Sequence, residues 1–138
     1  MPVVELTEPE LVAWGERLGR TIAYPLLIAF SGELGAGKTT LVRAIARSQG
    51  ALEPVTSQSY GIVREYLSAK GHVFHLDLYR LEGPQDLPRI GWDDILRIKR
   101  ALVMVEWPER ALGQLPAGHL ALHLEHVPDR PEIRRLSW

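Results

Sequence analysis

The sequence lacks cysteine altogether, which excludes disulfide bridges and cysteine-based metal sites. It also lacks any apolar run approaching about 18 residues, so it predicts no transmembrane helix. Residues 1–5 show neither the basic segment nor the apolar segment of a signal peptide. These absences are typical of a cytoplasmic protein, and we expect no association with membranes.

No single sign of charge dominates, because 16 basic residues stand against 17 acidic ones and the formal net charge is −1. The chain therefore carries no overall field that would draw it to nucleic acid or to a membrane surface. With 138 residues, of which 46% are hydrophobic and 24% charged, it has the size and composition of a soluble globular protein. We expect residues 1–138 to form a single domain.

What the sequence does contain is a glycine loop between an apolar stretch and a helical pattern. Residues 26–40 read Leu-Leu-Ile-Ala-Phe-Ser-Gly-Glu-Leu-Gly-Ala-Gly-Lys-Thr-Thr. The match to G-x-x-x-x-G-K-[ST], the Walker A phosphate loop, is made by Gly32, Gly37, Lys38 and Thr39. Apolar side chains then recur at helical spacing over residues 41–48. This arrangement of strand, loop and helix predicts a site for nucleotide phosphates.

Each residue type in the loop has a chemical reason to be there. Phosphate oxygens need backbone N–H groups within hydrogen-bond distance, and glycine leaves room for this approach and adopts positive φ. We expect Lys38 to place its charge on the terminal phosphates, with its ammonium facing solvent in the empty site, and Thr39 to ligate Mg²⁺. The predicted nucleotide-binding residues of the loop are Glu33, Leu34, Gly35, Ala36, Gly37, Lys38, Thr39 and Thr40.

The rest of the chain alternates strand and helix patterns. Helices are predicted at 7–20, 38–49 and 108–113, with short irregular or helical stretches at 83–86 and 91–97. Strands are predicted at 2–6, 25–30, 60–67, 72–79, 101–105, 119–126 and 133–136. Thr7 and Glu10 form a capping-box pattern at the start of the first helix.

The order of these elements predicts an α/β fold. The continuous apolar run 101–105 is typical of a central parallel strand, whereas 60–67 and 72–79 suggest a β-hairpin. We expect 119–126 and 133–136 to be late edge strands. The prediction is a three-layer P-loop NTPase-like domain whose central sheet is mostly parallel, with antiparallel edge strands and the ligand at the carboxyl ends of the strands.

Two apolar strands end in an acidic residue, which a nucleotide site needs to hold Mg²⁺ or its water. Val103-Met-Val-Glu106 has the Walker B form, and Val73-Phe-His-Leu-Asp77 has the same form on the predicted hairpin. Beside a phosphate loop, Asp77 and Glu106 are candidates for the carboxylates that hold the metal's water and the hydrolytic water. Each of them alone also fits an ordinary surface acid at a strand end.

Two further features next to the predicted site have competing interpretations. Trp107 follows Glu106 directly, and its flat ring is suited to stacking on a nucleotide base, but it also fits a tryptophan packed at the domain edge. The polar stretch 56–59, Thr-Ser-Gln-Ser, offers hydroxyls that could sense a γ-phosphate as switch loops do, or it is a solvated loop.

Histidines and basic residues elsewhere give weaker indications. His72 and His75 fall on opposite faces of one predicted strand, and the other three histidines lie in a stretch that alternates like a strand, so no zinc site is predicted. The basic residues of 80–100 are interrupted by aspartates and fit a solvated face, with contact to a partner or to tRNA as the alternative.

Four segments occur in order and at suitable spacing along the chain. They are Gly32-Glu-Leu-Gly-Ala-Gly-Lys-Thr-Thr40, Val55-Thr-Ser-Gln-Ser-Tyr60, His75-Leu-Asp-Leu-Tyr-Arg-Leu81 and Val105-Glu-Trp-Pro-Glu109. Together they resemble the TsaE (YjeE) family, the small P-loop ATPases of bacterial tRNA threonylcarbamoyladenosine (t6A) biosynthesis. The H-x-D-x-Y-R-L and V-E-W-x-E segments make the resemblance specific.

The resemblance implies a protein that binds ATP or ADP with Mg²⁺ and supports t6A formation at adenosine 37 of tRNA by acting on the TsaB–TsaD pair. By motif, it implies that Lys38 and Thr39 bind phosphate and Mg²⁺, and that Glu106 belongs to the metal site. It further implies that Asp77 assists catalysis and that Trp107 lies beside the nucleotide. Lys38, Asp77 and Glu106 are thus the expected catalytic residues, and Thr39 and Glu106 the expected metal ligands.

The chain departs from the usual family pattern in the switch segment. Ser57-Gln-Ser-Tyr60 stands where the family usually has Ser-Pro-Thr-Phe, so the segment lacks the fixed φ of proline. No arginine is marked by the sequence as a finger on the γ-phosphate, although Arg43, Arg64 and Arg80 are candidates. We therefore expect hydrolysis to be slow alone and faster with a partner.

Rival functions differ in what they require. A small-molecule P-loop kinase is the main alternative, and residues 89–100 would have to supply its arginine-bearing lid. A regulatory GTPase is disfavoured because the sequence has no N-K-x-D segment and no D-x-x-G after the loop. A scaffold with a vestigial loop is disfavoured by the intact set of Lys38, Thr39 and Glu106.

Overall fold

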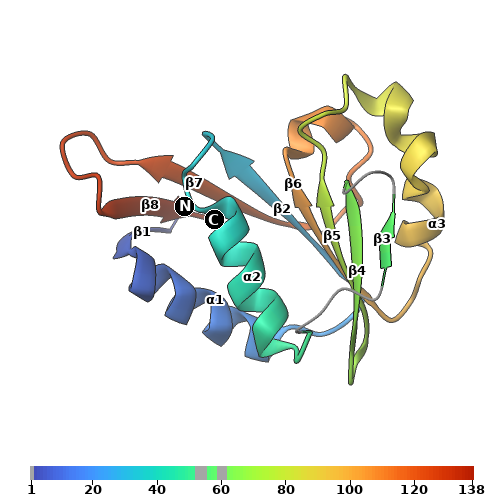
Figure 1. The fold of residues 1–138 in the computed structure, drawn as a ribbon, viewed down its shortest axis with the longest axis horizontal. Coiled ribbons are helices and arrows are strands. Elements are labelled where there is room, and N and C mark those ends of the chain that lie inside the picture. Colours follow the sequence, from blue (N-terminus) through green and yellow to red (C-terminus); the bar gives the residue numbers. More distant parts are fainter. Residues whose placement is uncertain (1, 52–55, 59–61) are drawn as a thin grey trace.

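A computed structural model describes residues 2–51, 56–58 and 62–138. The described residues form one eight-stranded sheet in the order β1-β8-β7-β2-β6-β5-β4-β3 (Figure 1). The strands are β1 (Val3–Thr7), β2 (Leu26–Gly32), β3 (Thr56–Gln58), β4 (Val63–Ser68), β5 (Gly71–Asp77), β6 (Ala101–Glu106), β7 (Leu120–His126) and β8 (Ile133–Ser137). The helices are α1 (Glu8–Thr21), α2 (Lys38–Ser48) and α3 (Trp92–Leu96), with 3₁₀ segments η2 (Pro84–Ile90) and η3 (Pro108–Ala111).

The middle of the sheet is parallel and its two flanks are antiparallel. β2 pairs in parallel with both β6 and β7, and β5 pairs in parallel with β6. β8 joins β7 to β1, and β4 joins β5 to β3, through antiparallel pairs. The predicted α/β fold, with a mostly parallel centre and antiparallel edges, is confirmed.

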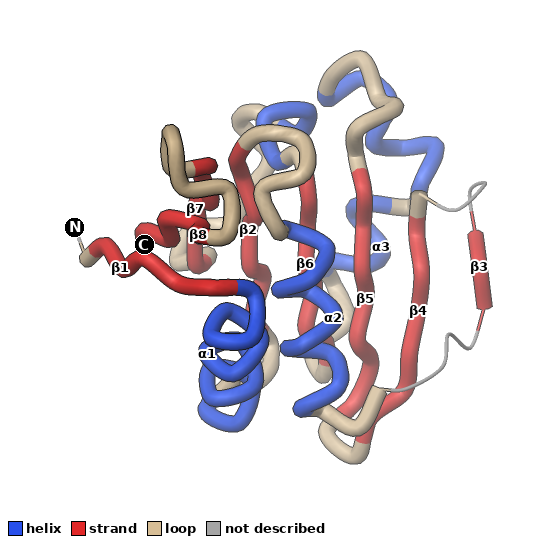
Figure 2. Tube along the Cα trace, turned by 60° about the vertical axis from the view of Figure 1, so that its left-hand side comes forward, coloured by secondary structure: helices blue, strands red, loops and turns tan. Residues whose placement is uncertain are grey.

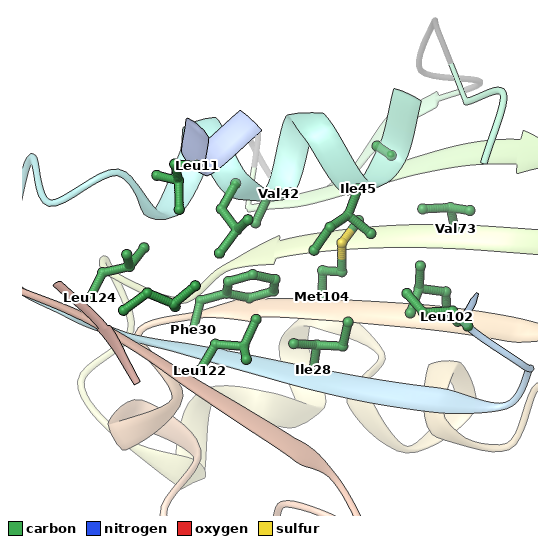
Figure 3. Close-up of a cluster of buried hydrophobic side chains, with 14 of the residues drawn as sticks. Leu11, Ile28, Phe30, Val42, Ile45, Val73, Leu102, Met104, Leu122 and Leu124 are labelled. Atoms are coloured by element: carbon green, nitrogen blue, oxygen red, sulfur yellow. The ribbon is translucent and has the colours of Figure 1, made fainter. Parts of the chain in front are cut away.

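Helical layers cover both faces of the sheet. α1 and α2 lie side by side against one face (Figure 2), while α3, η2 and η3 cover the other. The central strand β2 shows why both faces need cover, because its apolar side chains alternate between the two cores. Ile28 and Phe30 point into the core beneath α2 (Figure 3), and Leu27 and Ala29 join the core beneath α3.

Helix α1 fixes the position of α2 through unusually close packing. A Cβ atom on Gly15 would lie 2.7 Å from Leu41 Cδ1, and one on Gly19 would lie 1.7 Å from Ser48 Oγ. Only glycine therefore lets the two helices approach this closely.

The start of α1 has the predicted capping box, in which the N–H of Thr7 donates to Glu10 Oε1 at 2.9 Å and the N–H of Glu10 donates to Thr7 Oγ1 at 3.3 Å.

Two sequence-based expectations about the strands were wrong. Residues 119–126 and 133–136 were expected at an edge, but β7 lies between β2 and β8, and β8 lies between β7 and β1, which returns from the N-terminus to form the edge. Thr56–Gln58 was expected in a polar loop, but it forms edge strand β3 against β4. A polar segment can do so because an edge strand is paired on one side only.

In the described part of the chain, no helix is long and apolar enough to cross a bilayer.

Candidate nucleotide-binding site

The glycine loop lies between the carboxyl end of β2 and the start of α2. Gly32, Gly35 and Gly37 adopt positive φ values of 133°, 77° and 105°. A Cβ on Gly32 would lie 2.1 Å from the carbonyl oxygen of Leu124, so this position also needs glycine for the close approach of β7. No side chain among the described residues caps α2, which begins at Lys38. The first N–H groups of α2 are therefore available to an anion.

A cleft of about 250 Å³ opens at this point, and we call it the P-loop cleft. Loop residues, the first turn of α2 and the ends of β5 and β6 form its walls. Its lining residues are Leu34, Gly35, Gly37, Lys38, Thr39, Thr40, Asp77, Tyr79, Glu106 and Trp107. The structure thus brings most of the predicted site residues together. Glu33 and Ala36 are not in the lining: Ala36 is fully buried, and Glu33 is exposed to solvent outside the cleft.

The Lys38 ammonium was expected to face solvent in the empty site, but in the structure it is buried. The residue is only 4% exposed, and its Nζ donates to the carbonyl oxygen of Gly32 at 2.5 Å. The same Nζ lies 3.6 Å from the ring centroid of Trp107. A buried ammonium without an anion needs such partners, and a carbonyl and an aromatic face provide them. Burial lowers the pKa of Lys38, and the nearby carboxylates, Glu106 first among them, only partly oppose this shift.

Glu106 is held at the bottom of the cleft by two neighbours. Its carboxylate accepts from the Thr39 hydroxyl at 3.0 Å and 3.1 Å, and one oxygen lies 2.5 Å from His75 Nε2. Burial by itself raises the pKa of Glu106, but the hydrogen bonds and charges around it, those of His75 foremost, outweigh burial and leave the pKa below its usual range. The carboxylate is therefore an anion at neutral pH.

Asp77 stands beside Glu106 but in a different environment. The two residues are direct partners in the parallel pair of β5 and β6. The Asp77 carboxylate accepts the N–H of Tyr79 at 3.1 Å and lines the P-loop cleft, where it is partly exposed. Asp77 can thus reach a water molecule in the cleft, whereas both oxygens of Glu106 are already engaged within the protein.

Aromatic side chains form one wall of the cleft. Trp107 follows β6 with a left-handed φ of 59°, which turns the chain into η3. Its ring centroid lies 5.0 Å from that of Tyr79, with the two planes tilted by 51°. The stacking of a base on Trp107 stays a prediction, since in this arrangement the Lys38 ammonium lies over the face of the ring.

The oxygens of Thr39 and Glu106 fit a magnesium ion. Mg²⁺ prefers hard oxygen ligands, and in nucleotide sites it takes most of its ligands from phosphates and water. Over the described residues, no cluster of three or more histidine, aspartate or glutamate side chains could hold a metal alone. The protein therefore offers a partial ligand set, as a site for a nucleotide-bound magnesium would.

Two residues of the site, His75 and Tyr79, were not predicted from the sequence. His75 and Tyr79 belong to the H-x-D-x-Y-R-L segment, but Tyr79 was given no role in the site and His75 was considered there only as a zinc ligand. The alternation of side chains along a strand could have placed His75 in the site, because His75 and Asp77 are two residues apart and so lie on the same face of β5. Asp77 and Glu106 are paired across the sheet, so that face also bears Glu106.

Other predictions lie away from the cleft or outside the described residues. The supposed kinase lid does not cover the cleft: Arg89 and Arg97 approach Asp86 and Asp94 at 3.9 Å and 3.6 Å, and Arg100 donates to the carbonyl of Lys70 at 3.2 Å. Of the predicted switch segment, residues 55, 59 and 60 lie outside the described residues. Its remaining residues form β3.

Comparison with known proteins agrees with this geometry. The family model of the threonylcarbamoyl adenosine biosynthesis protein TsaE matches residues 6–135. The TsaE of Haemophilus influenzae is 32% identical over 112 residues, which cover 81% of this chain and 70% of that protein. The TsaE of Synechocystis sp. is 38% identical over 120 residues, which cover 83% and 75% of the two chains.

A solved structure supports the fold independently. The crystal structure of Bacillus subtilis YdiB matches with a TM-score of 0.73 over 98% of this chain and 83% of that one, at 22% identity. At this identity the match speaks for the P-loop fold alone. The family match, by contrast, covers nearly the whole chain. The chain therefore belongs to the TsaE family, whose proteins take part in tRNA threonylcarbamoyladenosine biosynthesis.

Proposed function

We propose that this protein is a cytoplasmic, single-domain ATPase that binds ATP with Mg²⁺ in the P-loop cleft and supports t6A modification of tRNA by acting on the TsaB–TsaD pair. The observation that carries the proposal is the pair of buried charged residues Lys38 and Glu106 at the start of an uncapped α2, with the Thr39 hydroxyl bonded to Glu106. Burying a charged group costs free energy, and a site for a nucleotide phosphate and its metal explains why these two charged residues are buried side by side with Thr39.

The residues of the cleft divide the work of binding. The N–H groups at the start of α2 take the phosphate oxygens, since the helix N-terminus favours negative charge. Lys38 exchanges its contacts with Gly32 and Trp107 for a phosphate oxygen, which is a better partner for an ammonium than a carbonyl. Thr39 and Glu106 hold Mg²⁺, which when bound neutralises charge on the phosphates.

Asp77 is the residue proposed to act on water. Its carboxylate borders the cleft and has a single backbone donor, so lone pairs remain to orient or deprotonate a water molecule. Glu106 is less suited to this task because Thr39 and His75 hold its carboxylate in place and its remaining lone pairs would serve the magnesium ion. The structure therefore favours a division of labour in which Glu106 serves the metal and Asp77 serves hydrolysis.

The proposed partner dependence rests on a missing charge. Lys38 is the single basic residue among the described residues that line the P-loop cleft. Arg43 and Arg64 line a neighbouring recess, and Arg80 lines another. Phosphoryl transfer without a second positive group is slower by about 10³- to 10⁵-fold. A partner that supplies this charge would act as an activator.

The test compares ATP turnover by this protein alone with turnover in the presence of TsaB and TsaD from the same source. We expect slow hydrolysis alone, faster hydrolysis with the pair, and a complex on gel filtration that depends on ATP. An unchanged rate together with no ATP-dependent complex would reject the partner-gated function. Turnover that rises only when a small-molecule acceptor is added would support a kinase instead.

A further inference from the structure

A second recess lies next to the P-loop cleft, on the α2 face of the sheet. It has a volume of about 200 Å³ and runs between α2 and β4. Val42, Ala46, Ala51 and Tyr66 contribute to its walls, and its charged and polar groups are Arg43, Arg47, Arg64, His75 and Thr39. We call it the arginine recess. Because Thr39 lines both hollows, the arginine recess and the P-loop cleft share a wall.

The three arginines present an unusual concentration of positive charge. Arg43 and Arg47 lie one turn apart on α2, and Arg64 extends from β4; all three are exposed. None of them forms an ion pair with another described residue, and no acidic residue lines the recess in the described part of the chain. Arg130 and Arg135, in contrast, both pair with Glu5.

The chemistry of the recess selects an anion. Guanidinium groups bind carboxylates and phosphates through paired, charge-assisted hydrogen bonds, and they lose less on desolvation than an ammonium does. The apolar walls formed by Val42, Ala46 and Tyr66 suit the aliphatic stem of an acidic side chain. A ligand here would lie directly beside His75, which is bonded to Glu106.

Charge balance decides between an acidic peptide and a nucleic acid. The whole chain has a formal net charge of −1, so it has no broad field to attract a polyanion. Binding to RNA normally uses an extended basic surface along the phosphate backbone, whereas the recess gathers three arginines around a volume of about 200 Å³. A short acidic segment fits such a local site better.

We propose that the arginine recess binds an acidic, Asp/Glu-rich segment of a partner protein. The segment would place carboxylates against Arg43, Arg47 and Arg64 and would rest next to the wall shared with the P-loop cleft. This inference goes beyond the proposed function, because the recess would bind such a segment whether or not the protein hydrolyses ATP.

The test measures binding of a fluorescein-labelled hexaglutamate peptide by anisotropy at low ionic strength, and locates it by ¹⁵N-resolved NMR. We expect amide shifts centred on α2 and β4. The double variant Arg43→Glu/Arg64→Glu should bind at least about tenfold more weakly, because two charge-assisted partners become repulsive. The matched control is Arg17→Glu/Arg20→Glu, which makes the same change in net charge on exposed positions of α1.

Three outcomes would overturn the proposal. Equal loss of binding in both double variants would mean that the peptide responds only to net charge. Tighter binding of a labelled uridine hexamer than of hexaglutamate would assign the recess to nucleic acid. Binding of neither probe, with the wild-type protein folded by circular dichroism, would leave the recess without an anionic ligand. The binding experiments contain no ATP, so their result does not depend on whether the protein hydrolyses ATP.

Discussion

At the bottom of the P-loop cleft, Lys38 and Glu106 are 4% and 3% exposed, whereas at its rim Leu34 and Tyr79 are 73% and 51% exposed. The buried pair is surrounded by fixed partners, namely Gly32, Trp107, Thr39 and His75. Of the rim residues, Asp77 accepts one backbone hydrogen bond and Tyr79 packs on Trp107.

The difference indicates two kinds of contribution to one site. Groups at the bottom are held in place before any ligand arrives, which makes their electrostatic effect large because little reorganisation is needed. Groups at the rim keep surface that a nucleotide or a partner can still cover. Substitutions at the bottom should therefore strongly weaken turnover or metal binding, whereas substitutions at the rim should leave binding largely intact and change rate or selectivity.

The largest effect is expected for Lys38→Ala. Loss of the only basic residue that lines the described cleft should reduce ATP turnover by about 10³-fold or more, since charge stabilisation dominates phosphoryl transfer. Turnover and binding of a fluorescent ATP analogue would measure this. Lys99→Ala, at an exposed position, is the matched control. Normal hydrolysis by a folded Lys38 variant would refute the phosphate-loop assignment.

Asp77→Asn should separate rate from binding. The amide keeps the size of the side chain and can still accept the N–H of Tyr79, but it cannot act as a base. We expect turnover to fall by about 10²-fold with nucleotide affinity nearly unchanged. Single-turnover hydrolysis and calorimetric binding would be compared, with Asp93→Asn as a surface control. Full activity would assign Asp77 to structure.

Glu106→Gln should act on the metal rather than on the water. The amide has the same shape, so the hydrogen bond from Thr39 can persist while the negative charge is lost. The apparent affinity for Mg²⁺ in the presence of ADP should fall by about 10- to 100-fold, as is usual when a group of a metal site is altered. A magnesium titration measures this, and an unchanged midpoint would contradict the proposed metal role.

Trp107→Ala should have the smallest effect. Stacking on an aromatic ring is worth about 1 kcal/mol, so ADP should bind about fivefold more weakly. Because Trp14, Trp92 and Trp138 also fluoresce, the nucleotide-dependent change must be measured in a variant that keeps Trp107 alone. We expect adenine to be preferred over guanine. Tighter binding of GDP than of ADP would exclude the assignment to an ATPase.

The sequence was informative where short motifs impose geometry. The glycine loop, the capping box of α1 and the two apolar strands ending in Asp77 and Glu106 each predicted a local structure that the fold contains. A glycine at positive φ or an acidic residue at a strand end depends only on residues that are close together in the sequence, so a sequence motif is enough to predict it.

Contacts between distant segments could not be read in the same way. The burial of Lys38 depends on where Trp107 lies, and the bond between His75 and Glu106 depends on β5 and β6 being neighbours. Likewise, the alternation of β7 shows which side chains are buried but not that β1 and β8 lie beyond it. These features depend on the pairing of strands, which propensity and periodicity do not specify.

The close contact of α1 with α2 has a thermodynamic consequence. In the described part of the chain, no residue of α1 lines the P-loop cleft, yet Gly15 and Gly19 lock α1 onto the helix whose first turn does. Any ligand that binds the folded cleft lowers the population of partly unfolded states in which α2 detaches from the sheet. Because α1 is packed on α2, states in which α1 opens together with α2 become less populated as well. Amide hydrogen exchange in α1 should therefore slow when nucleotide binds, although α1 lies outside the cleft.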